Sequence, residues 1–80
     1  MEIIMAVKIQ LFGQLKQMTG ESELFTDAAD TDRLTREMAT RYPALENLKY
    51  MIAVDRNIVQ ENTPNKAGQE LALLPPYSGG

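Results

Sequence analysis

Apolar and polar residues alternate from Val7 to Phe12, so that one face of this stretch is apolar and the other polar. A period of two residues is typical of a strand with one buried face. Residues 22–26 repeat the pattern and predict a second strand, which we expect to form a hairpin-like pair with the first. The connection between them contains a short stretch of helical character at 14–18.

One substantial helix is predicted after these strands. The segment Asp30–Thr31–Asp32 is a helix start, because a short polar side chain can accept hydrogen bonds from the free N–H groups of the first turn. Leu34, Met38 and Tyr42 then recur every four residues and form one apolar stripe. Pro43 disfavours helical geometry at the residue before it and ends the helix there.

The second half of the chain predicts a loop through Leu45 and Leu48, two short strands joined by a tight turn, a polar loop and a last strand. The predicted ranges are 51–54 and 58–59 for the two strands, 55–57 for the turn, 60–68 for the loop and 70–74 for the last strand. Pro75 and Pro76 stop the last strand, because neither can donate a ladder hydrogen bond.

The order strand, strand, helix, strand, strand, strand predicts an α+β fold, in which a mixed sheet packs on one main helix. We expect the last strand to lie parallel to the first in the centre of the sheet, which is the β-grasp arrangement of ubiquitin. The residues predicted to face the helix are Val7, Ile9, Leu11, Leu71 and Leu73. We divide the chain into a β-grasp domain, 1–76, and a flexible C-terminal tail, 77–80.

Composition narrows the possible functions. The 80 residues carry a formal charge of −3 and contain no basic stripe, which argues against nucleic acid as a partner. Histidine and cysteine are absent, so the commonest general base, thiolate nucleophiles and thiolate metal sites are all excluded. We therefore expect no catalytic machinery of the chain's own, no bound cofactor and no metal site.

The acidic pairs do not change that expectation. Capping of the helix explains Asp30 and Asp32, and an exposed strand face explains Glu21 and Glu23. The apolar run at 3–7 is too short to span a membrane and lacks the features of a secretory signal. We expect a cytoplasmic protein with no membrane partner.

The C-terminal residues Gly79 and Gly80 indicate that the chain end is itself a reactant. Without a Cβ, the glycine backbone can approach closely and pass through a narrow channel to an adenylating site. ATP activates the terminal carboxylate, and a sulfur donor can then displace AMP to leave a thiocarboxylate. Pro75–Pro76 stiffens the root of the tail, which lowers the entropy lost when a partner binds it.

The ending Leu73–Gly80, with its Pro-Pro-x-x-Gly-Gly pattern, resembles the C-terminus of the small, sulfur-carrying subunits of molybdopterin synthase. The resemblance runs along the chain from about Met5, which leaves Met1 and Met5 as alternative natural starts. It implies a ubiquitin-like sulfur carrier for molybdenum cofactor biosynthesis. Gly80 would be adenylated and thiocarboxylated, and its sulfur would pass to a cyclic pyranopterin precursor to form molybdopterin.

The resemblance also implies two partners. One is an adenylating enzyme of the ubiquitin E1 class, which uses the ATP. The other is the large subunit of molybdopterin synthase, in a heterotetramer with two small subunits at opposite ends of a large-subunit dimer. Tyr77 departs from the pattern, since the family usually has a smaller aliphatic residue there.

Phe12 and Leu74 are predicted to lie on the sheet face opposite the core stripe, as an apolar docking patch beside the tail root. Scattered exposed apolar residues are the alternative. The full set assigned to partner binding is Phe12, Leu74, Pro75, Pro76, Tyr77 and Ser78. Two other functions stay open: a sulfur carrier for thiamine synthesis or tRNA thiolation, and a ubiquitin-like protein modifier or plain interaction module.

Overall fold

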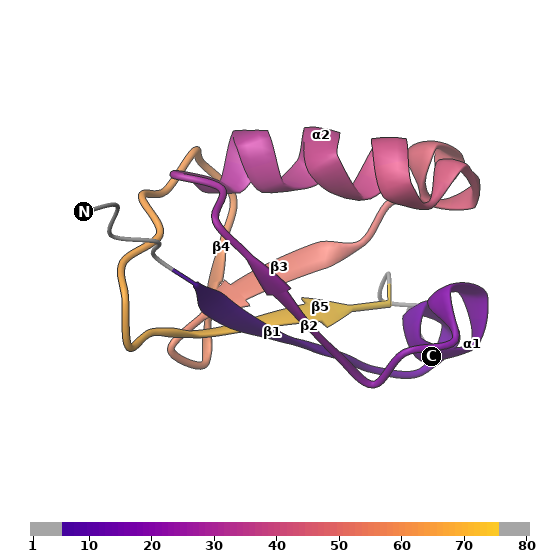
Figure 1. Ribbon diagram of the computed structural model, residues 1–80, viewed down its shortest axis with the longest axis horizontal. Helices are drawn as coiled ribbons and strands as arrows, with labels where there is room; N and C mark the ends of the chain where they lie inside the picture. Colours follow the sequence, from indigo (N-terminus) through magenta and orange to yellow (C-terminus); the bar gives the residue numbers. More distant parts are fainter. Residues whose placement is uncertain (1–5, 76–80) are drawn as a thin grey trace.

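The computed structural model describes residues 6–75, and the predictions for residues 1–5 and 76–80 fall outside that range. Five strands and three helical segments follow one another along the chain (Figure 1). In order they are β1 (Val7–Leu11), α1 (Gln14–Thr19), β2 (Glu23–Thr26), α2 (Thr31–Arg41), the 3₁₀ helix η1 (Pro43–Asn47), β3 (Met51–Val54), β4 (Asn57–Val59) and β5 (Glu70–Leu74).

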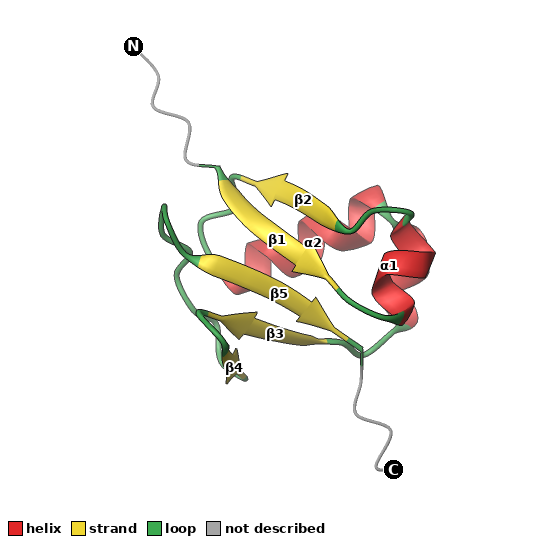
Figure 2. Cartoon of the chain, turned by 90° about the horizontal axis from the view of Figure 1, so that it is seen from below, coloured by secondary structure: helices red, strands yellow, loops and turns green. Residues whose placement is uncertain are grey.

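The five strands form one mixed sheet in the order β2-β1-β5-β3-β4. The first and last strands, β1 and β5, run parallel at its centre, and the other neighbours are antiparallel. Figure 2 shows α2 behind the sheet and α1 beyond the end of β1, and the sheet face opposite α2, the open face, is turned to the viewer. The predicted α+β class, β-grasp topology and central parallel pair are confirmed.

The core lies between the sheet and α2, and it uses the residues that the alternation predicts. Val7, Ile9 and Leu11 are buried, and so are Leu71 and Leu73 on the neighbouring strand. The helix contributes its predicted stripe, whose central residues Leu34 and Met38 are fully buried, while Tyr42 packs partly buried against the same cluster.

The predicted helix start is also observed. Asp30 precedes α2 in an extended conformation, and its Oδ1 accepts a hydrogen bond from the backbone N–H of Arg33 at 2.8 Å. Asn62, from the loop before β5, adds a second cap that the sequence did not predict, because its Oδ1 accepts from the N–H of Asp32 at 2.9 Å. This contact joins the otherwise irregular loop 60–68 to the helix.

The tight turn between β3 and β4 has the predicted left-handed geometry. Asp55 and Arg56 have φ values of 49° and 71°, and Val54 pairs with Asn57 across them. A two-residue loop with both central residues at positive φ matches the right-handed twist of a hairpin. The turn therefore fixes the register of β4 on β3.

One element differs from the prediction. The stretch after α2 was expected to be a loop, but Pro43–Asn47 forms the 3₁₀ helix η1 with Leu45 buried beneath it. The proline that ends α2 occupies the start of the next helical turn, where its missing N–H costs nothing. Short 3₁₀ turns of this kind carry no clear hydrophobic period, which is why the pattern did not reveal it.

Substitution of Leu34 by alanine tests the core assignment. Leu34 is fully buried, so Leu34→Ala should lower the free energy of unfolding by roughly 2–5 kcal/mol, from lost transfer energy plus the cavity left behind. Arg36 lies on the exposed face of the same helix, so Arg36→Ala should change the free energy of unfolding by less than about 0.5 kcal/mol. Urea denaturation followed by circular dichroism measures both, and equal effects would contradict the assignment.

Candidate functional site

The root of the C-terminal tail is the end of β5, in the middle of the sheet. β5 pairs with β1 on one side and with β3 on the other, so its last residue, Leu74, lies opposite Met51. One further bond extends the pairing past the end of β1, because the N–H of Phe12 donates to the carbonyl of Leu73 at 3.2 Å. Pro75 follows as the last described residue. The tail therefore leaves from a strand that is held on both sides.

The residues expected to react and to enter a partner channel lie outside the described range. They are Gly79 and Gly80 as the reacting end, and Pro76, Tyr77 and Ser78 as partner-binding residues. What the structure places is the surface around their root, to which Phe12, Leu74 and Pro75 belong. The docking roles of all six residues stay predictions.

Phe12 and Leu74 lie together on the open face of the sheet. Both line a hollow of about 440 Å³, and Phe12 remains 45% exposed although it is a large apolar side chain. The remaining lining residues are Gln10, Ala53, Arg56, Ile58, Glu70, Leu71 and Ala72. The predicted placement of Phe12 and Leu74 opposite the core is confirmed, and we call this hollow the apolar hollow after these two residues, although polar residues also line it.

Small side chains form the floor of the apolar hollow. Ala53 and Ala72 face each other across β3 and β5, and Ile58 faces Ala53 from β4. Two alanines between larger neighbours leave a depression, and Ile58, at 51% exposure, forms its far side. Ile58 was not predicted to belong to the site; its place follows from the register that the two-residue turn sets between β3 and β4.

Charged side chains frame the open face without forming a strong field. Arg56 Nε lies 3.9 Å from Glu70 Oε2 beside the apolar hollow, and Lys8 Nζ lies 3.3 Å from Glu23 Oε2 nearer the β2 edge. Exposed pairs of this kind contribute about 0–1 kcal/mol. Lys8 therefore has a carboxylate partner within the chain.

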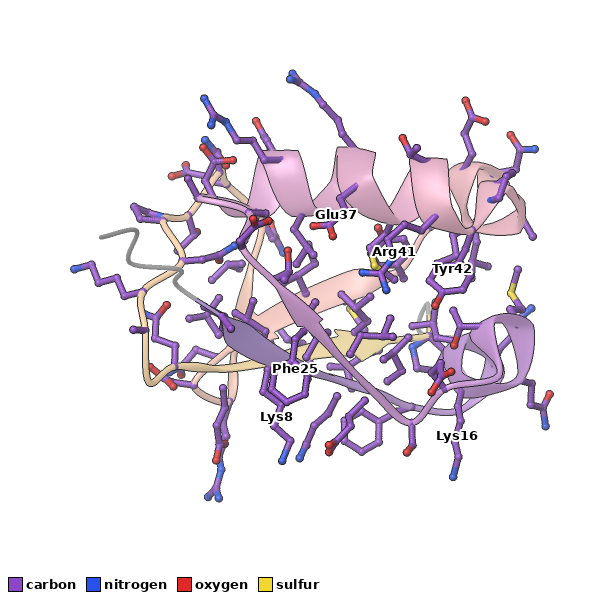
Figure 3. All side chains as sticks on the ribbon, viewed as in Figure 1. Lys8, Lys16, Phe25, Glu37, Arg41 and Tyr42 are labelled. Atoms are coloured by element: carbon purple, nitrogen blue, oxygen red, sulfur yellow. The ribbon has the colours of Figure 1, made fainter. Side chains whose placement is uncertain are left out.

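A second exposed aromatic lies on the same face but outside the apolar hollow. Phe25, on the edge strand β2, is 57% exposed and pairs directly with Lys8 across the β1–β2 ladder. Figure 3 places the two side chains next to each other below the sheet. Phe25 does not line the apolar hollow, so the face carries one aromatic beside the tail root and one remote from it.

Residues 6–75 contain no group of three acidic, histidine or cysteine side chains placed to hold a metal ion. Burial raises the pKa of Tyr50 above its ordinary value of 10.0, against a smaller opposite effect of its hydrogen bond with Thr35. A phenol with a raised pKa is neutral near pH 7 and cannot act as a base there.

Among residues 6–75, no helix is long and apolar enough to cross a membrane.

The raised pKa of Tyr50 predicts a loss of stability in alkali. Between the ordinary pKa of 10.0 and the higher folded value, the unfolded chain has lost the phenolic proton and the folded chain has not. The unfolded state then binds fewer protons, so stability falls as the pH rises above about 10. Tyr50→Phe should show a shallower loss between pH 9 and pH 11 in urea denaturation, and an unchanged slope would contradict the burial of Tyr50.

Comparison with protein families gives a match that covers almost the whole chain. The model of the ThiS family matches residues 9–80. A curated relative, the molybdopterin synthase sulfur carrier subunit of Escherichia coli (strain K12), is 30% identical over 80 residues, which cover 92% of this chain and 99% of the relative.

Solved structures show the same fold. A protein–protein complex of subunits 1 and 2 of the molybdopterin-converting factor from Helicobacter pylori 26695 contains a chain that is 34% identical, with a TM-score of 0.69 and coverage of 95% of this chain and 100% of that one. The solution structure of small archaeal modifier protein 1 from Methanosarcina acetivorans is 23% identical, with a TM-score of 0.79 and coverage of 99% and 100%. At that identity the second likeness shows the fold alone.

Proposed function

The chain belongs to the ThiS family, and from that premise we propose that it is the sulfur carrier subunit of a molybdopterin synthase. The observation that carries the proposal is the full-length match to a curated sulfur carrier subunit of that synthase. The Pro-Pro-x-x-Gly-Gly ending supports it, because it supplies the terminal glycine pair on which the proposed chemistry acts.

The reaction that we propose takes place at the carboxylate of Gly80 in two steps. The carboxylate attacks the α-phosphate of ATP, which forms an acyl adenylate and releases pyrophosphate. A donor of sulfide-level sulfur then attacks the acyl carbon, and AMP leaves with one of the two carboxylate oxygens, so that sulfur takes the place of that oxygen. ATP belongs to the activating enzyme, which we expect to be of the E1 class, so this chain needs no nucleotide site.

The described residues contribute presentation rather than chemistry. β5 is paired on both sides, so the tail is attached to a part of the sheet that cannot shift without breaking two ladders. The apolar hollow lies directly beside that attachment, with Phe12 and Leu74 as its apolar residues nearest the tail root. A partner that covers the hollow would bury apolar area and bring its own active site to the tail.

We propose that the large subunit of molybdopterin synthase is one such partner. The support is the 34% identical chain in a complex of subunits 1 and 2 of the molybdopterin-converting factor. We assign the action of the carrier to the cytoplasm, where ATP for activation is available. In a heterotetramer, two carriers would serve a central dimer of large subunits.

Two other functions would also begin with adenylation of the C-terminal carboxylate. A carrier for thiamine synthesis or tRNA thiolation would form the same thiocarboxylate, and a protein modifier would instead form an isopeptide bond from the adenylate. The Pro-Pro ending and the relative of the synthase favour the molybdopterin route over both. The likeness to a small archaeal modifier protein supports the fold and no particular acceptor.

Intact mass spectrometry tests the loading reaction. The chain is incubated with ATP, an E1-class activating enzyme and a sulfur donor, and we expect the mass shift of a single oxygen-to-sulfur exchange. Deletion of Gly80, or a tag fused after it, should abolish the shift while circular dichroism shows an intact domain. A wild-type chain that stays unmodified beside a relative that the same enzyme loads would contradict the proposal.

Phe12→Ser tests the apolar hollow as a docking surface, with Phe25→Ser as the matched control. Both phenylalanines are exposed on the open face, but only Phe12 lines the hollow. Loss of an apolar anchor at an interface costs on the order of 2 kcal/mol, so Phe12→Ser should weaken binding of the large subunit by about 30-fold. Phe25→Ser should change the affinity for the large subunit less than about twofold, because residues outside an interface contribute little to binding.

Isothermal titration calorimetry with the large subunit measures both variants of this pair. Since both residues are exposed, neither substitution should lower the thermal midpoint much. Equal effects of the two substitutions on binding would exclude the apolar hollow as the docking surface.

A further inference from the structure

The tail root contacts a second segment of the chain, the turn between β1 and α1. Gly13 lies in this turn, and a Cβ placed on it would stand 3.1 Å from Pro75 Cγ and 3.7 Å from Pro75 Cδ. The first distance is shorter than the 3.4 Å at which ordinary van der Waals contact begins. The backbone of Gly13 therefore lies close to the ring of Pro75, and a side chain at position 13 would press on that ring unless it moved by a few tenths of an ångström.

The backbone of Gly13 is unusual as well. Its φ of 56° and ψ of −127° fall in a region that is open to glycine and closed to residues with a side chain. In that conformation its carbonyl accepts hydrogen bonds from the N–H groups of Lys16 at 3.1 Å and Gln17 at 3.3 Å, which begins α1. The same residue thus starts a helix and contacts the proline.

The neighbours of Gly13 in the chain fix its position beside Pro75. The residue before it, Phe12, donates its N–H to the carbonyl of Leu73, two residues before the proline. Leu15, two residues after it, is fully buried in the core. Hydrogen bonding on one side and core packing on the other leave Gly13 little freedom to move away from the ring.

We propose that Gly13 is a positioning residue for the loading reaction, which sets the direction in which the tail leaves the sheet through its contact with the ring of Pro75. The proposal rests on the proposed function. Because proline has a fixed φ, the position of its ring limits the direction in which the chain can continue. The proposal makes the placement of the reacting carboxylate depend on this contact, and a misplacement of about 1 Å can cost roughly 100-fold in rate.

Backbone strain is a competing reason for a glycine here, and Gly20 is a control for part of it. Gly20, at the other end of α1, also has a positive φ, 76°, but a Cβ there would meet nothing within 4 Å. Alanine at Gly20 therefore introduces left-handed strain without a contact to the tail root. Alanine at Gly13 introduces a larger strain, because its ψ of −127° lies outside the left-handed helical region, together with the contact, so the two effects are separated by removing the ring of Pro75.

The experiment measures steady-state loading of the chain by an E1-class activating enzyme, with ATP and a sulfur donor, as a function of carrier concentration. Gly13→Ala should lower kcat by about tenfold and change KM less than about twofold, because the apolar hollow still docks while the tail is misdirected. Gly20→Ala should change both constants less than about twofold.

A double variant tests whether the effect of Gly13→Ala on kcat acts through the ring of Pro75. Pro75→Ala removes the Cγ and Cδ atoms that a new Cβ would meet, so Gly13→Ala should cause little further loss of kcat in a Pro75→Ala chain. The contact is also measured without enzyme, as a nuclear Overhauser effect between the α protons of Gly13 and the ring protons of Pro75. This measurement uses the wild-type chain, so it decides the question even where Gly13→Ala does not fold.

Three results would overturn the inference: equal kcat for Gly13→Ala and Gly20→Ala, a full additional loss in the double variant, or no Overhauser effect between Gly13 and Pro75. Failure of the proposed function looks different. In that case the wild-type chain itself is not loaded, although the enzyme loads a known carrier in the same reaction.

Discussion

The parallel pairing of β1 with β5 at the centre of the sheet is the interaction on which the rest of the structure depends. It buries Ile9, Leu71 and Leu73 against the main helix, and it brings the carboxyl ends of the first and last strands to the same edge. Because the strands are parallel, Phe12 and Gly13, which follow β1, lie beside Pro75, which follows β5. The surface at the tail root is a consequence of this topology.

A central strand is also a suitable place from which to present a reactive chain end. An edge strand can fray, whereas β5 is held by β1 and β3, and opening it would expose much of the core. The chain offers neither histidine nor cysteine for chemistry of its own. Under the proposed function the partners supply the catalysis, and this protein holds the tail root beside a surface that partners can cover.

Much of the fold could be predicted from the sequence because local signals and the hydrophobic pattern agree. The alternation in β1 and β5, the stripe of α2 and the cap at Asp30 each have a local cause, and all were observed. The 3₁₀ helix at Pro43–Asn47 was missed, since so short an element has no period to detect.

The site was predictable only in part. Phe12 and Leu74 were placed correctly, because alternation alone determines their face. Ile58 was missed, since its place depends on the registers of two ladders at once, Ile58 on Ala53 and Ala53 on Ala72. The contact of Gly13 with Pro75 joins residues that are distant in sequence, and no local pattern encodes it.

Single-turnover sulfur transfer tests the central claim most directly. The thiocarboxylated chain is mixed with the large subunit of a molybdopterin synthase and the cyclic pyranopterin precursor, and the mass of the chain and the dithiolene product are followed together. We predict that the chain returns to its carboxylate form as product appears, and that neither happens without the large subunit. A thiocarboxylate that persists while an authentic carrier is consumed in the same mixture would contradict the assignment to molybdopterin synthesis.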